Sequence, residues 1–132
     1  MATVKIVPFG VSDMRVMDVQ ERYVSIIPHV WRNLLMVEQS MVGPWSWTMW
    51  SVHGRALCAC GILSDGGAWA FLSPHIRPHL LAATRRTHLE LQGHLLEKGP
   101  VYAEVDRTHL QALRWVKLLG FRHDAGERWV FD

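Results

Sequence analysis

The stretch AWAFLSPHIRPHLLAATRRTHLELQGHLL, residues 68–96, joins a short apolar strand pattern to a long helix pattern. The corner between them, residues 73–79, holds two prolines and two histidines but no glycine. A further strand pattern follows the helix at residues 101–105, so we predict a right-handed parallel crossover between the two strands. The helix carries a stripe at alternating spacings of three and four residues, formed by Leu81, Thr84, His88, Leu91 and Leu95.

Three β-rich runs, at residues 45–52, 55–63 and 68–73, are separated by the turn sequences HG and SDGG. Glycine adopts a positive φ readily, so Gly54 and the pair Gly66 and Gly67 predict tight turns between antiparallel strands. The three runs are therefore predicted to form an antiparallel meander.

The remaining patterns complete one α+β domain over residues 1–132. TVKIVPF at residues 3–9 predicts a first strand, and residues 13–40 predict two helices or one helix broken at Pro28. Thr108 is predicted to cap a helix that Gly120 ends, before a last strand at residues 128–132. This order predicts an α/β mixed sheet with helices packed on both faces.

Composition excludes several classes of protein. Apolar residues make up 49% and charged residues 20% of the 132 residues, as in an ordinary folded domain. A formal net charge of +2 is too small to predict nucleic-acid binding, although it does not exclude local basic patches. No stretch reaches the roughly 20 apolar residues of a membrane span, and the N-terminus has no apolar signal region. We therefore expect a soluble protein without a signal peptide.

The two cysteines, Cys58 and Cys60, are two positions apart on one predicted strand. Such neighbours point to the same face at a separation that strains a disulfide, so we predict buried, reduced thiols in a cytoplasmic setting. A metal site usually shows a second close pair of ligands, and none follows at suitable spacing. We predict no metal site.

The element order and the segment HLQALRWVKLLGF, residues 109–121, resemble the GNAT acetyltransferases, whose last helix typically reads N-x-x-A-x-x-x-Y-x-x-x-G-F. Ala112, Gly120 and Phe121 meet this frame. The strand from Trp69 to Ser73 is similar to the W-F-V-x-S strand of the acetyltransferase-like internal virion proteins of short-tailed phages. This resemblance implies a GNAT fold and a phage protein that works in the host cytoplasm or in the virion.

Active GNAT members read roughly R-G-x-G-x-G/A at the corner, where glycines let the backbone approach the pyrophosphate of acetyl-CoA. Their small positions fall here on Pro78, Leu80 and Ala82. Pro78 has no N–H to donate, and the Leu80 side chain would stand where the phosphate approaches. The resemblance thus implies a degenerate acetyl-CoA loop and no cofactor. If the protein is active, its acetyl-CoA site is predicted to include Leu72, Arg77, His79, Leu80, Leu81 and Ala82.

The family's catalytic tyrosine, a general acid, corresponds to Val116, and its asparagine corresponds to His109. Valine cannot transfer a proton. Glu104 is a candidate general base at the end of a strand, although that face can simply be solvated. Arg77 and His79 near the helix N-terminus could bind an anion through side chains, but solvated charges at a proline-stiffened turn are favoured.

Surface contacts with a protein partner are predicted at two places. Trp45 and Trp47 share one face of their strand, and Trp50 lies on the other. By default these rings are expected to fill the core, whereas a ring that is exposed would indicate a surface for a protein partner. A polar stripe on the last helix, either solvated or in contact with an acidic protein or nucleic acid, consists of Arg107, Gln111, Arg114 and Lys117.

Three hypotheses follow. The first is a GNAT-fold protein without acetyl-CoA chemistry that acts by contact with a phage structural protein or a host protein, in virion assembly or as a minor virion component. The second is an active or atypical N-acetyltransferase that uses acetyl-CoA. The third is a small inhibitor of a host enzyme.

Overall fold

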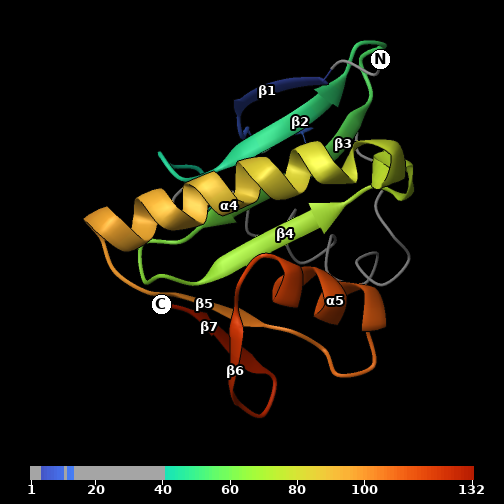
Figure 1. The fold of residues 1–132 in the computed structure, drawn as a ribbon. Coiled ribbons are helices and arrows are strands. Elements are labelled where there is room, and N and C mark those ends of the chain that lie inside the picture. The colour runs from blue at the N-terminus through green and yellow to red at the C-terminus, as the bar shows by residue number, and fades with distance from the viewer. Residues whose placement is uncertain (1–3, 11, 14–40) are drawn as a thin grey trace.

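The computed structural model describes residues 4–10, 12–13 and 41–132. Figure 1 labels its elements. They are β1 (Val4–Pro8), β2 (Trp47–Ser51), β3 (Ala56–Ile62), β4 (Ala68–Leu72), a 3-10 helix η2 (Pro74–His79), α4 (Leu80–Glu97), β5 (Val101–Glu104), α5 (Leu110–Leu118), β6 (Arg122–Ala125) and β7 (Arg128–Phe131). Apart from residue 13, the helices predicted over residues 13–40 lie outside the described residues.

The first sheet is a four-stranded antiparallel meander with the order β1-β2-β3-β4. Gly54 turns between β2 and β3 with φ 80°, and Gly66 turns between β3 and β4 with φ 89°. Positive φ is available to glycine at no steric cost, so these residues fix the two turns. The predicted meander is confirmed.

The second sheet is antiparallel with the order β5-β7-β6. The strand β6 was not predicted; it forms a hairpin with β7 through Gly126 at φ 57°. The predicted parallel crossover is wrong, because β4 and β5 belong to separate sheets, and β5 pairs with β7 instead. Between β4 and β5 there is one isolated parallel bridge, Gly67 to Tyr102, where the Tyr102 N–H donates to the Gly66 carbonyl at 2.8 Å.

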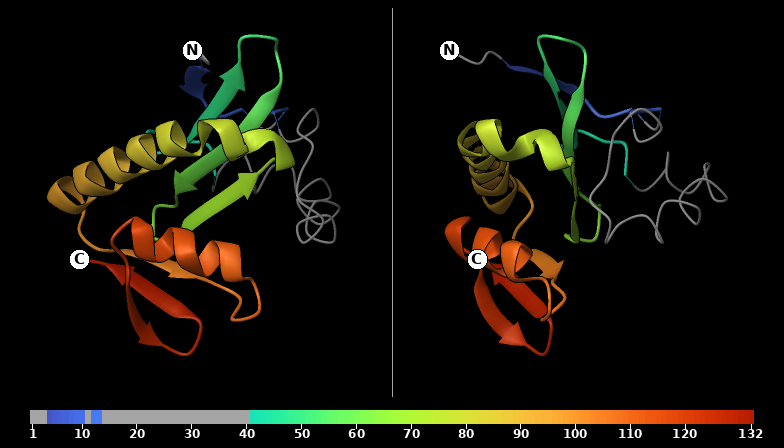
Figure 2. Two further views of the ribbon diagram at one scale, coloured as in Figure 1. Left: turned by 45° about the vertical axis from the view of Figure 1, so that its right-hand side comes forward. Right: turned by 90° about the vertical axis from the view of Figure 1, so that its right-hand side faces the viewer.

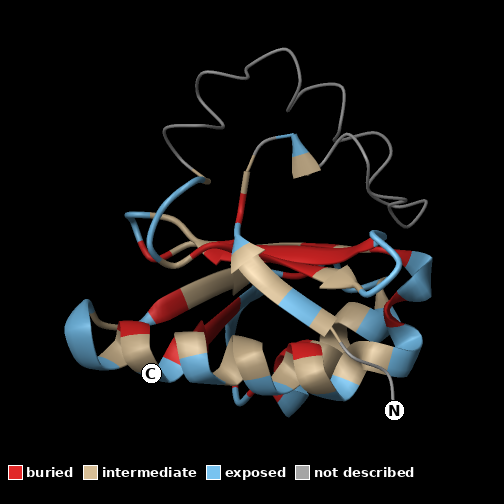
Figure 3. Ribbon diagram, turned by 90° about the horizontal axis from the view of Figure 1, so that it is seen from above, coloured by how far each residue is buried: buried red, intermediate tan, exposed pale blue. Residues whose placement is uncertain are grey.

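Both helices of the described residues lie on the same face of the four-stranded sheet (Figure 3). Under α4 a buried cluster forms around Trp47, Met49 and Cys60, and Ile76 and Ala83 pack into it. The prediction of helices on both faces therefore holds for this face. On the opposite face Phe9, Ala56, Ala59 and Phe71 form another buried cluster.

The helices α4 and α5 lie side by side and run in the same direction (Figure 2). The Trp115 indole Nε1–H donates to the Thr84 hydroxyl at 2.9 Å, and His88 Nδ1 lies 3.1 Å from the Leu119 carbonyl oxygen. Leu91 and Leu95 continue this contact into the core of the second sheet.

Two local predictions for the helices need correction. Leu81 is 64% exposed, so it lies on the outer side of α4 and not on the stripe that packs against the core. Thr108 is not the N-cap residue of α5, because His109 holds that position and makes no side-chain cap hydrogen bond. The Thr108 N–H and hydroxyl donate to the Asp106 carboxylate, at 2.8 and 2.7 Å.

Candidate functional site

A cleft of about 1380 Å³ opens where β4 and β5 part beyond their single bridge. Its walls come from β4, from the corner after β4, from the end of β5 and from α5. Small and apolar side chains, including Ala68, Ala70, Leu72 and Ala103, line much of it. The missing ladder between the two sheets is therefore what creates the cleft.

The strand edges that face the cleft carry backbone groups without a strand partner. The Ser73 N–H donates to the Leu57 carbonyl at 2.9 Å, so alternation along β4 directs the backbone groups of Ala70 and Leu72 toward the cleft. By the same argument on β5, the Glu104 backbone also faces the cleft, since β5 is bonded to β7 on its other edge. No described strand pairs with these edges, so an extended ligand could bond to them.

The corner after β4 closes on its own hydrogen bonds. Ser73 is fully buried, its hydroxyl accepts the His75 N–H at 3.1 Å, and its carbonyl accepts the Ile76 N–H at 3.1 Å. The 3-10 helix η2 then runs directly into α4, where the Leu80 N–H donates to the Arg77 carbonyl. A corner built this way presents few free N–H groups to an anion, since Pro78 contributes none and Leu80 uses its own.

The residues predicted for an acetyl-CoA site are only partly brought together. Leu72, Arg77 and Leu80 line the cleft. Ala82 packs against the core cluster beneath α4, and Leu81 points into solvent on the outer side of the helix. The half-buried His79 immediately precedes α4 and makes no side-chain cap to that helix.

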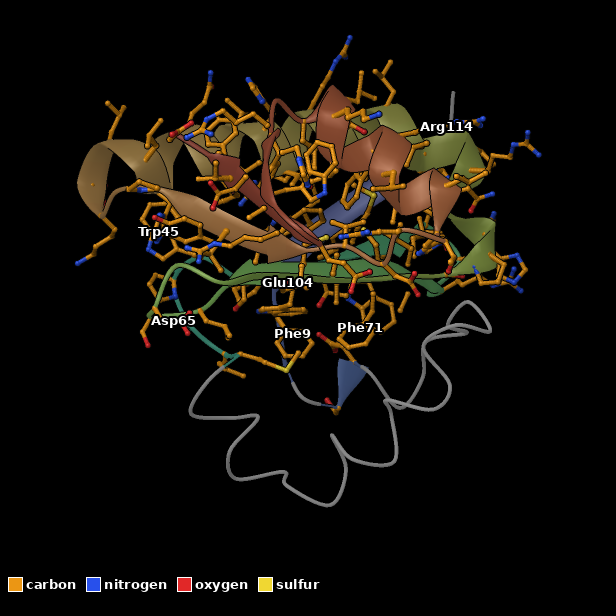
Figure 4. All side chains as sticks on the ribbon, turned by 90° about the horizontal axis from the view of Figure 1, so that it is seen from below. Phe9, Trp45, Asp65, Phe71, Glu104 and Arg114 are labelled. Carbon is orange, nitrogen blue, oxygen red and sulfur yellow. The ribbon has the colours of Figure 1, made fainter. Side chains whose placement is uncertain are left out.

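The candidate catalytic positions lie at the other wall of the cleft. Glu104 is exposed at the end of β5, in register with Arg128 of β7 (Figure 4). The Arg128 guanidinium stacks 4.2 Å from the Tyr102 ring and lies 3.5 Å from the Asp124 carboxylate. Val116 is 5% exposed and belongs to the core, so the position of the family's tyrosine holds an apolar, packed side chain.

Neither cysteine is placed to act as a nucleophile. Cys58 and Cys60 are both buried and free, as predicted. A hydrogen bond with Cys58, and then burial, raise the pKa of Cys60 well above its usual range. The thiol therefore stays protonated at neutral pH, and a thiolate is the form that attacks. Among the described residues no group of acidic, histidine and cysteine side chains could hold a metal ion.

The predicted partner-binding residues have different surroundings. Trp47 is 2% exposed and fills the core with Met49, whereas Trp50 packs on the opposite face, so the predicted alternation is confirmed. Trp45 is half-buried, with its ring edge-to-face against His94 at 5.3 Å. The predicted polar stripe is solvent-exposed, at Arg107, Gln111, Arg114 and Lys117.

Lys117 lies over the Trp129 ring, 5.9 Å from its centroid, and the backbone N–H of Arg107 donates to the Glu127 carboxylate at 2.9 Å. The structure gives Arg114 no such contact among the described residues and places it beside the cleft. In the described part of the chain, no helix is long and apolar enough to span a membrane.

Several solved acetyltransferases share this architecture at low sequence identity. A spermidine N-acetyltransferase, a chimera of SpeG from Vibrio cholerae and hSSAT, matches with a TM-score of 0.65 and 8% identity over 97% of this chain and 94% of that chain. An acetyltransferase of the GNAT family from Staphylococcus aureus Mu50 matches with a TM-score of 0.63 and 11% identity over 97% and 98%. The aminoglycoside acetyltransferase AAC(6')-Ib, solved with coenzyme A, matches with a TM-score of 0.62 and 10% identity over 98% of this chain and 94% of that chain.

The chain thus has the GNAT acetyltransferase fold, as the sequence predicted. Neither a model of a known protein family nor a curated protein sequence matches it. At these identities the likeness shows the fold alone. The link to phage virion proteins is not part of what these structures show.

Proposed function

We propose that this GNAT-fold protein is non-catalytic and acts by contact with a protein partner. The observation that carries the proposal is the closed corner between β4 and α4. The chain there is a 3-10 helix with two prolines, and the first N–H of α4 is bonded within the corner itself. A pyrophosphate needs free, convergent N–H groups at this place, and the residues present do not fit it.

The opposite wall of the cleft supports the same proposal. A general acid for a leaving thiolate needs a titratable group, and Val116 supplies an apolar side chain that packs into the core. Loss of the phosphate cradle and loss of the acid are independent changes on different elements. Because the cradle and the acid are both absent, we infer that the fold serves to present a surface to a protein partner. We include in this proposal a role in a phage particle or against a host protein, as the resemblance implies.

Calorimetric titration with acetyl-CoA and with CoA tests the proposal. We expect no binding heat and no thermal stabilisation at millimolar ligand. A ligand present at 100 times its dissociation constant would stabilise the fold by about 2.7 kcal/mol, so binding would be plain. Such stabilisation of the wild-type chain would refute the proposal.

A matched variant makes the titration more informative. The double substitution Pro78→Gly and Leu80→Gly restores small residues at the two positions that depart most from the family's pattern. Binding by this variant and not by the wild-type chain would tie the loss of cofactor binding to those two residues. Circular dichroism would first establish that the variant keeps the native helix content.

A second candidate function, an acyl-CoA N-acyltransferase, is favoured by the open cleft of about 1380 Å³ and its unpaired strand edges. Under this alternative Glu104 would act as the general base toward a substrate amine. Release of free CoA thiol from acetyl-CoA in the presence of a polyamine, reduced in Glu104→Gln, would support it over the first proposal.

A further inference from the structure

The two helices of the described residues carry the same pattern on their outer sides. Each shows leucine, arginine, leucine at positions i, i+4 and i+8, which lie on one face of a helix. The four leucines are 62 to 69% exposed, far more than a leucine that packs in a core. We call these six residues the double row: Leu81, Arg85 and Leu89 of α4, and Leu110, Arg114 and Leu118 of α5.

The contacts between α4 and α5 bring the two rows to matching heights. The bonds Trp115 to Thr84 and Leu119 to His88 pair residues that are 31 positions apart, and the helices run in the same direction (Figure 2). Corresponding members of the rows are 29 positions apart. The two-residue difference amounts to about 3 Å along the helix axis, so the rows lie side by side.

Charge on this surface is one-sided. No described carboxylate forms an ion pair with Arg85 or Arg114, whereas Arg86 is paired with Glu90 at 2.8 Å. The segment that forms α5 contains no acidic residue, and Lys117 adds a further cation next to its row. Figure 4 shows Arg114 on the helix side of the molecule, away from Phe9 and Phe71.

We propose that the double row binds an acidic amphipathic helix of a protein partner. Exposed leucines gain free energy when another apolar side chain covers them, and unpaired arginines between them select carboxylates on the partner. A partner helix that lies along both rows would contact their leucines through apolar side chains at helical spacing, which is a common mode of recognition. The inference names the class of partner for the proposed function and therefore rests on it.

Two other occupants fit the double row less well. A second copy of this chain would bring the arginines of one double row against those of the other, and like charges in an interface are repulsive. A nucleic acid would pair with the arginines but would leave the four leucines against a polyanion, and phosphate contacts call for cations.

The test is nuclear magnetic resonance of the full-length, 15N-labelled chain with a synthetic 18-residue peptide. The peptide carries leucine at helical spacing on one face and glutamate on the flanks, and its control has every glutamate replaced by lysine. We expect saturable shifts of α4 and α5 amides with the acidic peptide, weakened by salt, and none with the lysine control.

Variants assign the binding to the double row. The pair Arg85→Glu and Arg114→Glu should weaken the acidic peptide by roughly tenfold or more. The matched control, Lys5→Glu with Arg55→Glu, changes the net charge equally at exposed positions in β1 and in the connection between β2 and β3, and should leave affinity within about twofold. The pair Leu89→Ser and Leu118→Ser should also weaken binding without changing the salt dependence.

Three outcomes would overturn the inference. These are no shift of α4 and α5 with the acidic peptide, equal or stronger shifts with the lysine peptide or an oligothymidylate, and a dimer in sedimentation that Leu118→Glu dissolves. If the proposed function is wrong, acetyl-CoA should shift the amide resonances of Ala70 and Leu72 in the cleft. That result is distinct from the response of α4 and α5 to the peptide, so the two failures can be told apart.

Discussion

Gly61 in β3 is a position where a single methyl group should disturb the fold. A Cβ atom built on Gly61 would lie 2.5 to 2.7 Å from three atoms of the Trp69 ring, closer than real Cβ contacts come. Trp69 cannot withdraw freely, because its ring packs against Phe9 with centroids 4.9 Å apart and against Phe71 at 6.1 Å. The substitution Gly61→Ala must therefore shift a ring that is held on two sides.

The net effect of Gly61→Ala is the sum of two opposed terms. Overpacking typically costs about 1–3 kcal/mol. Replacing glycine by alanine at an unstrained backbone recovers about 0.4–1 kcal/mol by restricting the unfolded chain. We expect a net loss of roughly 1–2 kcal/mol in the free energy of unfolding, measured by urea denaturation, together with a changed tryptophan fluorescence.

A double-mutant cycle with Trp69→Ala separates the steric term from the backbone term. With the ring absent, Gly61→Ala should be neutral or stabilising, giving a coupling energy of about 1–3 kcal/mol. An equal cost of Gly61→Ala in both backgrounds would show that the Trp69 ring is not the obstacle and would refute the reasoning.

Three further predictions concern the corner, the thiols and a surface ion pair. Ser73→Ala removes the buried acceptor of an N–H two residues on, so it should cost about 1–2 kcal/mol in urea denaturation, whereas a null effect would show that the cap is dispensable. Cys58 and Cys60 should resist iodoacetamide at pH 8 in the folded protein and react in denaturant, because the raised pKa and burial keep Cys60 a protonated thiol; rapid labelling of the native state would contradict this. Hydrogen bonding to Arg122 lowers the pKa of Asp132. The ion pair therefore stabilises the fold at neutral pH, and this contribution is lost as the pH falls through the lowered pKa. The difference in unfolding free energy between the wild type and Asp132→Asn should vanish in acid and shrink in salt.

Local chemistry explains what could be predicted from the sequence. Gly54 and Gly66 mark the meander turns because positive φ has a residue-level signature. The β6–β7 hairpin had a similar signal in Gly126, within the polar run DAGER, which could have been used.

The cleft was missed because strand pairing is not local. Periodicity along β4 and β5 shows which faces are apolar, but it does not show which edge of β5 finds a partner. One edge of β5 forms an antiparallel ladder with β7, whereas the other edge meets β4 only at the Gly67 bridge. The double row was likewise not predicted, since its register depends on tertiary contacts between the helices, Trp115 with Thr84 and Leu119 with His88.

Because only the bridge at Gly67 joins β4 to β5, β4 is an edge strand, although β4 lies in the middle of the molecule. Its amide hydrogens at Ala70 and Leu72 should exchange with solvent far faster than those of β3, which has a strand on each side. The unpaired edge of the apolar segment AWAFL can also pair with a strand of another chain, and such pairing at a sheet edge promotes aggregation.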